Sequence, residues 1–320
     1  MPSIVFLDAS TLSHGDLDLG VLNHLGHVIL YPTSNKNEII KRIKTAEIVV
    51  TNKAILDTEA LSHALRLNFI SICATGTNVV DLNAAKEKGI RVANVTDYST
   101  SAVAQHTMTF ILNWATQIHR YIQEPKLWAK STTFTRLDYP VIELAGHSLG
   151  LLGTGKIGCE VGRLAEAFGM IVRGWARKSS PHPRKKDPWP RLPLRQLLAN
   201  SDIVSLHCPL TEETHHVINR QSLRWMKKGA FLVNTGRGGL VDEMALKEAL
   251  LAGHLGGAGL DVLSIEPPPP NHPLINLQHS NLMITPHSAW TTHEARKRLL
   301  QETVINIEAF LKGKTRNCIV

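Results

Sequence analysis

Three side chains in the second half of the chain have the chemistry of a site that moves a proton and binds an anion. Arg237 follows an apolar run and a glycine, Glu266 precedes a run of prolines, and His287 follows a Thr-Pro pair. A guanidinium binds a carboxylate through two parallel hydrogen bonds, and an imidazole exchanges protons near neutral pH. Taken singly, each has a plainer interpretation as a solvated charge or a hydrogen-bonded loop histidine. Their significance therefore depends on the fold that carries them.

A glycine-rich turn upstream of these residues supplies that context. The apolar run Ser148–Leu152 leads into G-T-G-K-I-G at 153–158, and a helical pattern and a second apolar run, Ile171–Trp175, follow. In this setting the first glycine permits a tight turn, the second lets the backbone approach a pyrophosphate, and the third lets the helix pack on the sheet. The alternative is a purely structural turn. We expect a dinucleotide site at this turn, formed by Gly153, Gly155, Lys156, Ile157 and Gly158.

The end of the second apolar run indicates which dinucleotide is bound. An acidic residue that binds the adenosine ribose is usual at this point, but the sequence has Ala176, followed by Arg177 and Lys178. Cations attract a 2′-phosphate, whereas an acid repels it. We therefore expect NADP(H) to be favoured, with NAD(H) as the alternative cofactor.

The positive charge of the chain is concentrated near the same position. Lysine and arginine number 35 against 27 acidic residues, for a net charge of +8, and eight of the cations lie between Arg173 and Arg195. A solvated loop is the plainer interpretation of such a cluster, and a nucleic-acid partner is another. Because the cluster adjoins the expected adenosine site, it favours cofactor binding over a nucleic-acid partner.

Composition and periodicity describe the elements that must position these residues. The chain has 320 residues, 43% of them hydrophobic and 19% charged, which is typical of a folded protein of two domains. No uncharged apolar run is long enough to span a membrane, and no signal peptide is evident. The four cysteines lack the spacing of a metal or redox site. We expect a cytoplasmic α/β protein without a metal.

Short Val/Ile/Leu runs alternate with amphipathic stretches, which predicts parallel sheets covered by helices on both faces. The expected strands are Ile4–Leu7, His27–Leu30, Ile48–Thr51, Phe69–Ile72, Val92–Ala93, Ser148–Leu152, Ile171–Trp175, Ile203–Leu206, Phe231–Asn234, Gly257–Asp261 and Leu282–Ile284. Helical spacing is found in Glu59–Leu67, Ser101–Ile122, Gly158–Phe168, Glu243–Ala252 and Thr291–Leu311. The proline-rich stretches Pro181–Pro193 and Glu266–Pro273 are expected to be loops.

The sequence resembles the D-isomer-specific 2-hydroxyacid dehydrogenase family over essentially its whole length. The resemblance rests on G-T-G-K-I-G at 153–158, N-T-G-R-G at 234–238, D-V-L-S-I-E-P at 261–267 and T-P-H-S-A-W at 285–290. Residues 74–81 and 97–107 look most like those of glycerate dehydrogenases, which are hydroxypyruvate reductases. Ala176 departs from the acid that those enzymes carry. The resemblance implies hydride transfer between NAD(P)H and a small 2-oxo acid, such as hydroxypyruvate to D-glycerate or glyoxylate to glycolate.

The resemblance also implies roles for individual residues. His287 would be the general acid and base, Glu266 its hydrogen-bond partner, and Arg237 the ligand of the substrate carboxylate and carbonyl. The backbone amides around Thr75, Gly76 and Thr77 would hold the other carboxylate oxygen. Asp261 would contact the nicotinamide side of the cofactor. Further residues match positions that line the cofactor, namely Thr75, Thr107, Pro209 and Thr235.

For the architecture, the resemblance implies two doubly wound parallel-sheet domains. A Rossmann-type cofactor domain, 99–287, would be inserted in a flavodoxin-like substrate domain made of 1–98 and 288–320. Family members are usually homodimers, and Asn113–His147 would form much of the contact. A dinucleotide-sensing regulatory protein, like the corepressors built on this fold, is the alternative to an enzyme, because a fold alone does not give a function.

Overall fold

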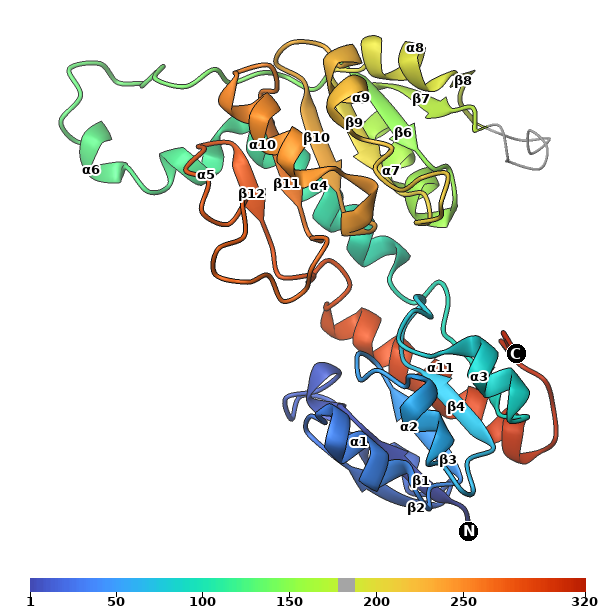
Figure 1. Cartoon of the computed structure of the whole chain (residues 1–320). Helices are drawn as coiled ribbons and strands as arrows, with labels where there is room; N and C mark the ends of the chain where they lie inside the picture. Colours follow the sequence, from blue (N-terminus) through green and yellow to red (C-terminus); the bar gives the residue numbers. More distant parts are fainter. Residues whose placement is uncertain (178–187) are drawn as a thin grey trace. The chain divides into compact units, whose positions relative to one another are not determined.

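The computed structural model describes residues 1–177 and 188–320 of the chain (Figure 1). The chain divides into two compact units. Unit 1 comprises Met1–Ser99 and Thr291–Val320, and unit 2 comprises Thr100–Trp290. The chain therefore leaves unit 1 once and returns to it for its last helix.

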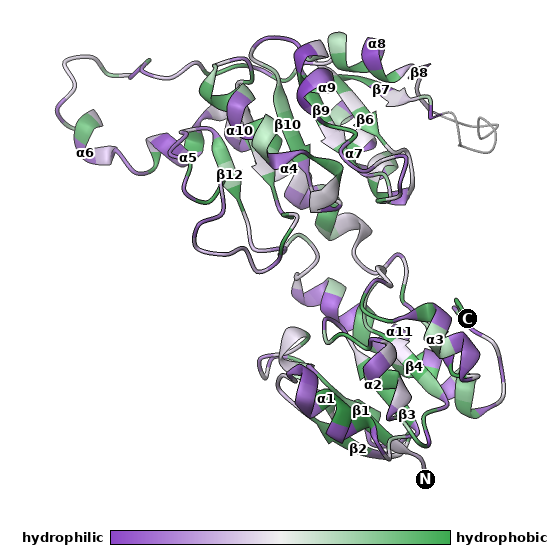
Figure 2. Cartoon of the chain, viewed as in Figure 1, coloured by the Kyte–Doolittle hydropathy of each residue, from purple (hydrophilic) through white to green (hydrophobic). Residues whose placement is uncertain are grey.

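Unit 1 is built on a parallel sheet with the strand order β2-β1-β3-β4-β5. This is the order of a flavodoxin-like doubly wound domain. Strands β3 and β4 are buried along their whole length because they are apolar on both faces, and Figure 2 shows the contrast with the mixed hydropathy of the covering helices. The strands are β1 (Ser3–Phe6), β2 (His27–Leu30), β3 (Ile48–Thr51), β4 (Phe69–Ile72) and β5 (Arg91–Ala93). The α-helices are α1 (Lys36–Ile43), α2 (Thr58–Ser62), α3 (Leu82–Glu87) and α11 (His293–Leu311).

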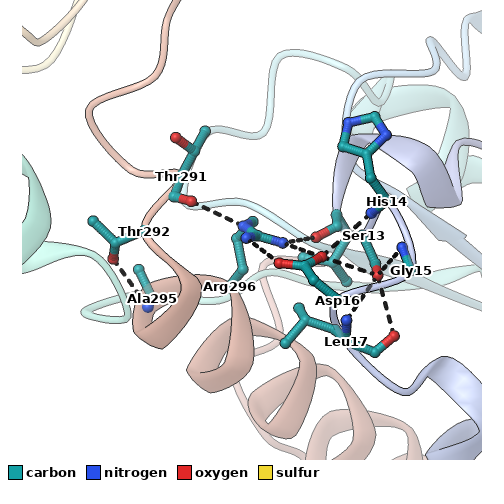
Figure 3. A network of polar contacts seen from close by, with 10 residues as sticks. Ser13, His14, Gly15, Asp16, Leu17, Thr291, Thr292, Ala295 and Arg296 are labelled. Carbon is teal, nitrogen blue, oxygen red and sulfur yellow. Dashed lines mark hydrogen bonds and ion pairs between the residues drawn. The ribbon is translucent and has the colours of Figure 1, made fainter.

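The first turn of helix α11 is hydrogen-bonded to the N-terminal part of unit 1 through Arg296 (Figure 3). Arg296 donates from both terminal nitrogens to the carboxylate of Asp16, at 3.0 and 2.6 Å, and from Nη1 to the carbonyl of Leu12 at 2.9 Å. Its Nε donates to the carbonyl of Thr291, at 2.9 Å. The guanidinium also holds the pKa of Asp16 well below its usual range. One side chain thus joins the residue at which the chain re-enters unit 1 to the loop that follows β1.

Unit 2 contains a parallel sheet with the strand order β12-β11-β10-β9-β6-β7-β8. The order reverses between β6 and β9, and such switch points are where doubly wound sheets bind ligands at the carboxyl ends of the strands. The strands are β6 (Ser148–Leu152), β7 (Ile171–Trp175), β8 (Arg191–Leu192), β9 (Ile203–Leu206), β10 (Phe231–Asn234), β11 (Gly257–Leu260) and β12 (Leu282–Ile284). The helices that cover the sheet include α4 (Thr100–Thr116), α7 (Lys156–Ala167), α8 (Leu194–Ala199), α9 (Arg220–Trp225) and α10 (Glu243–Leu251).

Two expectations about elements of unit 2 are wrong. The helix expected over Ser101–Ile122 ends at Thr116, because Gln117 has a left-handed backbone with φ of 53°. Two short helices follow, α5 (Ile118–Tyr121), which is drawn beside β12 in Figure 1, and α6 (Pro125–Trp128), which lies farther from the sheet. The stretch Pro181–Pro193, expected to be a loop, contains the short edge strand β8.

Within 1–177 and 188–320, none of the helices has the length and apolarity needed to cross a bilayer. Over the same residues, no cluster of three or more His, Cys, Asp or Glu side chains is arranged to hold a metal ion. The four cysteines are free thiols.

Candidate active site

The glycine-rich turn joins β6 to α7 at the switch point of the unit 2 sheet. Gly153 has φ of 110°, and a Cβ there would lie 2.5 Å from the carbonyl carbon of His207 at the end of β9. A Cβ at Gly158 would lie 2.0 Å from the carbonyl oxygen of Gly153, so helix and turn are in direct backbone contact. A Cβ at Gly155 would meet nothing within 4 Å. The turn is therefore closed toward the sheet and open at Gly155, as a pyrophosphate approaching the start of α7 requires.

The helix that begins at this turn places the other two residues of the motif. Lys156 is exposed and is the first residue of α7. Ile157 is half-buried and packs against a cluster of buried side chains that includes Leu149 of β6 and Val161 of α7. Their backbone N–H groups belong to the first turn of the helix, where amides have no partner within the helix itself.

The carboxyl end of β7 carries the residues expected at the adenosine ribose. Ala176 donates its N–H to the carbonyl of Leu192 in β8, at 2.8 Å. The guanidinium of Arg177 donates to Glu213 from Nε at 2.9 Å and to Thr211 from Nη2 at 3.1 Å. Lys178 lies outside the described residues. One guanidinium is thus held at the end of β7, with an acidic partner from the loop after β9.

His207 stands directly beside the turn, and the sequence did not single it out. Its ring shares a hydrogen bond of 2.8 Å with the hydroxyl of Ser205. Burial lowers the pKa of His207 to about 4, so the imidazole is neutral at pH 7. A histidine that ends an apolar strand was the only available signal, and such residues are more often structural than functional.

The turn after β10 presents Arg237. Asn234 holds this turn, because its side chain accepts the N–H of Gly236 at 3.0 Å and donates to the carbonyl of Arg237 at 2.8 Å. Arg237 is half-buried and donates from Nη1 to the carbonyl of Gly236. Thr235, next to it, forms a hydrogen bond of 3.0 Å with Thr107 of α4. The guanidinium therefore sits on a turn fixed from both sides.

Glu266 and His287 form a hydrogen-bonded pair that joins the ends of two neighbouring strands. Glu266 Oε2 lies 2.7 Å from His287 Nδ1, and Glu266 Oε1 accepts the N–H of Leu263 at 3.0 Å. Both side chains are partly exposed, at 35% and 27%. His287 has φ of 52°, and its N–H donates to the carbonyl of Asp261 at 2.8 Å. The pairing orients the ring and leaves Nε2 as the nitrogen that faces a ligand.

Asp261 organises the segment that carries His287. Its buried carboxylate accepts the hydroxyl of Thr285 at 2.6 Å and the N–H groups of Ser288 and Ala289 at 2.8 and 2.9 Å. His106 of α4 completes the network, since its Nε2 lies 3.0 Å from the Thr285 hydroxyl oxygen. Because that hydroxyl donates to Asp261, His106 must be the donor of this bond. His106 was not among the expected site residues, because it lies within the expected helix Ser101–Ile122.

The structure of unit 2 brings the three expected catalytic residues to one edge of the sheet. Strands β10, β11 and β12 are adjacent and parallel, so the segments that follow them meet at their carboxyl ends. The contact is close, since a Cβ at Gly238 would lie 2.0 Å from the carbonyl carbon of Leu263. The Arg237 turn and the Glu266 loop are therefore in backbone contact.

Other expected residues lie in different places. Thr75, Gly76 and Thr77 follow β4 in unit 1, where the Thr75 hydroxyl donates to the carbonyl of Val95 at 2.9 Å. Gly76 and Thr77 are partly exposed. Pro209 follows β9 in unit 2 and accepts the hydroxyl of Thr214 at 2.7 Å.

A model of the NAD binding domain of D-isomer specific 2-hydroxyacid dehydrogenases matches residues 108–289. The chain belongs to this family. A hydroxypyruvate reductase of Blautia hydrogenotrophica is 38% identical to this D-2-hydroxyacid dehydrogenase over 321 residues, which cover 99% of each chain.

Two solved structures of similar proteins extend the comparison. The D-lactate dehydrogenase of Aquifex aeolicus, complexed with NAD and lactic acid, has a TM-score of 0.85 and 31% identity, and the match covers 97% of this chain and 96% of that one. The acyclic imino acid reductase Bsp5, in complex with NADPH and D-Arg, has a TM-score of 0.86 and 29% identity, and covers 99% and 100%. The expected family and the two parallel-sheet domains are confirmed, and the dehydrogenase is supported over a regulatory protein. A nicotinamide dinucleotide is the cofactor of this family of enzymes, and the open Gly155 cradle fits one.

Proposed function

We propose that this D-2-hydroxyacid dehydrogenase reduces a small 2-oxo acid, with hydroxypyruvate and glyoxylate as the favoured substrates and D-glycerate and glycolate as the products. The observation that carries this proposal is the His287–Glu266 pair, at 2.7 Å, on the same sheet edge as Arg237. Support for the substrate comes from the hydroxypyruvate reductase of Blautia hydrogenotrophica. A bound nicotinamide dinucleotide supplies or accepts the hydride.

In the proposed mechanism, His287 moves the proton. Its Nδ1 is engaged by Glu266, so Nε2–H donates to the carbonyl oxygen of the 2-oxo acid and takes the proton back from the hydroxyl in the reverse direction. The Glu266 carboxylate fixes the tautomer and stabilises the imidazolium. Arg237 binds the substrate carboxylate and polarises the carbonyl, because a guanidinium forms short, charge-assisted hydrogen bonds with oxyanions.

The binding roles of the remaining residues are part of the same proposal. Asp261 contacts the nicotinamide side of the cofactor, and a carboxylate that already accepts three hydrogen bonds retains capacity for one more. The turn at 153–158 binds the pyrophosphate, and Thr75, Thr107, Pro209 and Thr235 line the cofactor. Amides around Thr75, Gly76 and Thr77 bind the second carboxylate oxygen. Residues 99–287 then form the cofactor domain, and 1–98 with 288–320 form the substrate domain.

A preference for NADP(H) over NAD(H) is the next part of the proposal. It is supported by Ala176, which lacks the carboxylate that would repel a 2′-phosphate, and by the guanidinium of Arg177 beside it. Lys178 would add a second cation. The related reductase Bsp5 is complexed with NADPH, whereas the related D-lactate dehydrogenase is complexed with NAD, so the family accommodates both.

We also propose a cytoplasmic homodimer that associates through Asn113–His147. Large apolar side chains of this segment are exposed, with Phe134 at 91% and Leu137 at 87%, and exposed apolar patches mark association surfaces. Figure 1 shows the segment extending from the unit 2 sheet with α5 and α6. A Phe134→Glu variant should elute as a monomer in size-exclusion chromatography with light scattering. An unchanged dimer would refute this contact.

The experiment that tests the proposed function is a panel of 2-oxo acids assayed with NADPH and with NADH. We expect the highest kcat/KM for hydroxypyruvate or glyoxylate with NADPH. An enzyme that reduces only bulkier 2-oxo acids would refute the substrate assignment, and a strong preference for NADH would refute the cofactor assignment. Absence of turnover with every 2-oxo acid would refute the function itself.

A further inference from the structure

Glu266 lies in a loop that is held by a second carboxylate–imidazole pair, Glu243 and His272. The loop runs from the end of β11 toward β12 and is irregular around Glu266, which is followed by four prolines. Three hydrogen bonds from residues on either side of Glu266 converge on Glu243, in the first turn of α10. The side chain of Glu243 is 11% exposed, so its charge is largely removed from water.

Glu243 binds the loop on both sides of Glu266. Its Oε1 accepts the N–H of Ser264 at 2.7 Å, and its Oε2 accepts the Ser264 hydroxyl at 2.6 Å. Its Oε2 also lies 3.0 Å from Nε2 of His272. Ser264 lies two positions before Glu266, and His272 lies six positions after it. The Glu243 carboxylate therefore joins the two ends of the loop segment that carries Glu266.

The imidazole of His272 is held in one orientation by its surroundings. Its side chain is 3% exposed, and its Nδ1 accepts the N–H of Leu274 at 3.3 Å. A nitrogen that accepts a hydrogen bond carries no proton, so the proton of the neutral ring is on Nε2 and is donated to Glu243. The pair is therefore a donor and an acceptor with fixed geometry.

We infer that Glu243 and His272 are positioning residues for the reaction, which hold the Glu266 loop so that Glu266 meets His287. This inference rests on the proposed role of the Glu266–His287 pair. Displacement of the loop moves the Glu266 carboxylate away from the His287 ring, which it orients through the bond of 2.7 Å. Small displacements of reacting groups cost about a hundredfold in rate.

The test compares Glu243→Gln with Glu248→Gln. Glu248 lies on the same helix but pairs with Arg220 on the surface, at 2.6 Å, which makes it the matched control. A glutamine at 243 has one acceptor oxygen for three donors and turns its amide toward one of them. We expect kcat for hydroxypyruvate to fall at least about tenfold in Glu243→Gln, with an unchanged KM for NADPH, and to stay unchanged in Glu248→Gln.

A double-mutant cycle separates positioning from a general loss of structure. If Glu243 acts through Glu266, Glu243→Gln should have no further effect on kcat in an enzyme that already carries Glu266→Gln. Equal losses in both backgrounds, or an unchanged kcat in a folded Glu243→Gln enzyme, would overturn the inference. The milder variant Ser264→Ala, which removes one exposed hydroxyl, should lower kcat by about two- to tenfold without loss of folding, and an unchanged kcat would count against the inference.

Hydrogen exchange gives a readout that needs no turnover. Peptides covering 261–272 should exchange faster in Glu243→Gln than in the parent enzyme, because the amide of Ser264 loses its acceptor. Peptides from β6 and α7 should be unaffected. Unchanged exchange in 261–272 would overturn the inference. An enzyme that reduced no 2-oxo acid yet showed the local exchange would instead refute only the proposed function.

Discussion

Substitution of Gly155 by alanine is expected to weaken cofactor binding without weakening the fold. Gly155 has φ of −73° and ψ of −168°, a conformation that alanine adopts freely, and the added Cβ meets nothing within 4 Å. Alanine is a poorer helix N-cap than glycine, which lowers the free energy of unfolding by about 0.5–1 kcal/mol. Alanine also restricts the backbone of the unfolded chain, which raises the free energy of unfolding by about 0.4–1 kcal/mol. The free energy of unfolding should therefore change by less than about 1 kcal/mol.

The substitution should weaken the binding of the dinucleotide. The methyl group occupies space that the pyrophosphate needs for close approach to the backbone, and inserting one carbon into a packed contact costs about 1–3 kcal/mol. The Kd for NADPH should therefore rise between about fivefold and 150-fold. Fluorescence titration measures this Kd, and thermal unfolding without cofactor measures stability.

Gly158→Ala is the matched control for this prediction. Its Cβ would lie 2.0 Å from the carbonyl oxygen of Gly153, so the helix must move, and both the Tm without cofactor and NADPH binding should fall. Tight NADPH binding by Gly155→Ala would refute the reasoning, because the pyrophosphate would then not lie against this turn. A large fall in the Tm of Gly155→Ala would show that the space around it is not open.

Three further predictions concern charged residues. Arg177→Ala should lower the ratio of kcat/KM for NADPH to that for NADH by about tenfold or more. Glu213→Gln, which removes the acidic partner of Arg177, should raise this ratio. An unchanged ratio in both variants would exclude Arg177 as the ligand of the 2′-phosphate. Arg237→Lys should lower kcat/KM for hydroxypyruvate about tenfold to a hundredfold while the Kd for NADPH is unchanged, and a selective loss of NADPH binding would contradict this role. Burial raises the pKa of Asp202, but hydrogen bonds from Lys227 and Ser148 outweigh this effect and lower the pKa to about 2. Because the pKa is depressed in the folded protein, the ionised Asp202 stabilises the fold fully above about pH 4, and this stabilisation is lost as the pH falls toward 2. Thermal unfolding should therefore show a smaller loss of Tm between pH 5 and 2 in Asp202→Asn than in the parent enzyme, and equal losses would contradict this assignment.

The sheets of both units were largely predictable because a strand buried on both faces is a continuous apolar run. Eight of the expected strands, including Ile48–Thr51 and Phe231–Asn234, have the bounds that the structure gives them. The end of α4 was not predictable, since Gln117 has neither the freedom of glycine nor the constraint of proline, yet its backbone is left-handed. Strand β8 was missed because two residues between prolines carry no periodicity.

The site was predictable where its residues follow strands and unpredictable where a loop path decides the contacts. Arg237, Glu266 and His287 could be named because each stands in a family motif just after an apolar run. The contact of Glu243 with His272 joins positions 29 residues apart through an irregular, proline-rich loop, and no periodicity describes such a path. His106 was hidden for a similar reason, because its partner Thr285 is 179 residues away.

The rate of a single turnover with saturating NADPH and hydroxypyruvate tests the central claim most directly, in the parent enzyme and in His287→Gln. If the imidazole donates the proton to the carbonyl oxygen, the rate of NADPH oxidation should fall by about a hundredfold to ten-thousandfold in the variant, while the Kd for NADPH stays the same. A variant that oxidises NADPH as fast as the parent enzyme would contradict the account, because another group would then have to supply the proton.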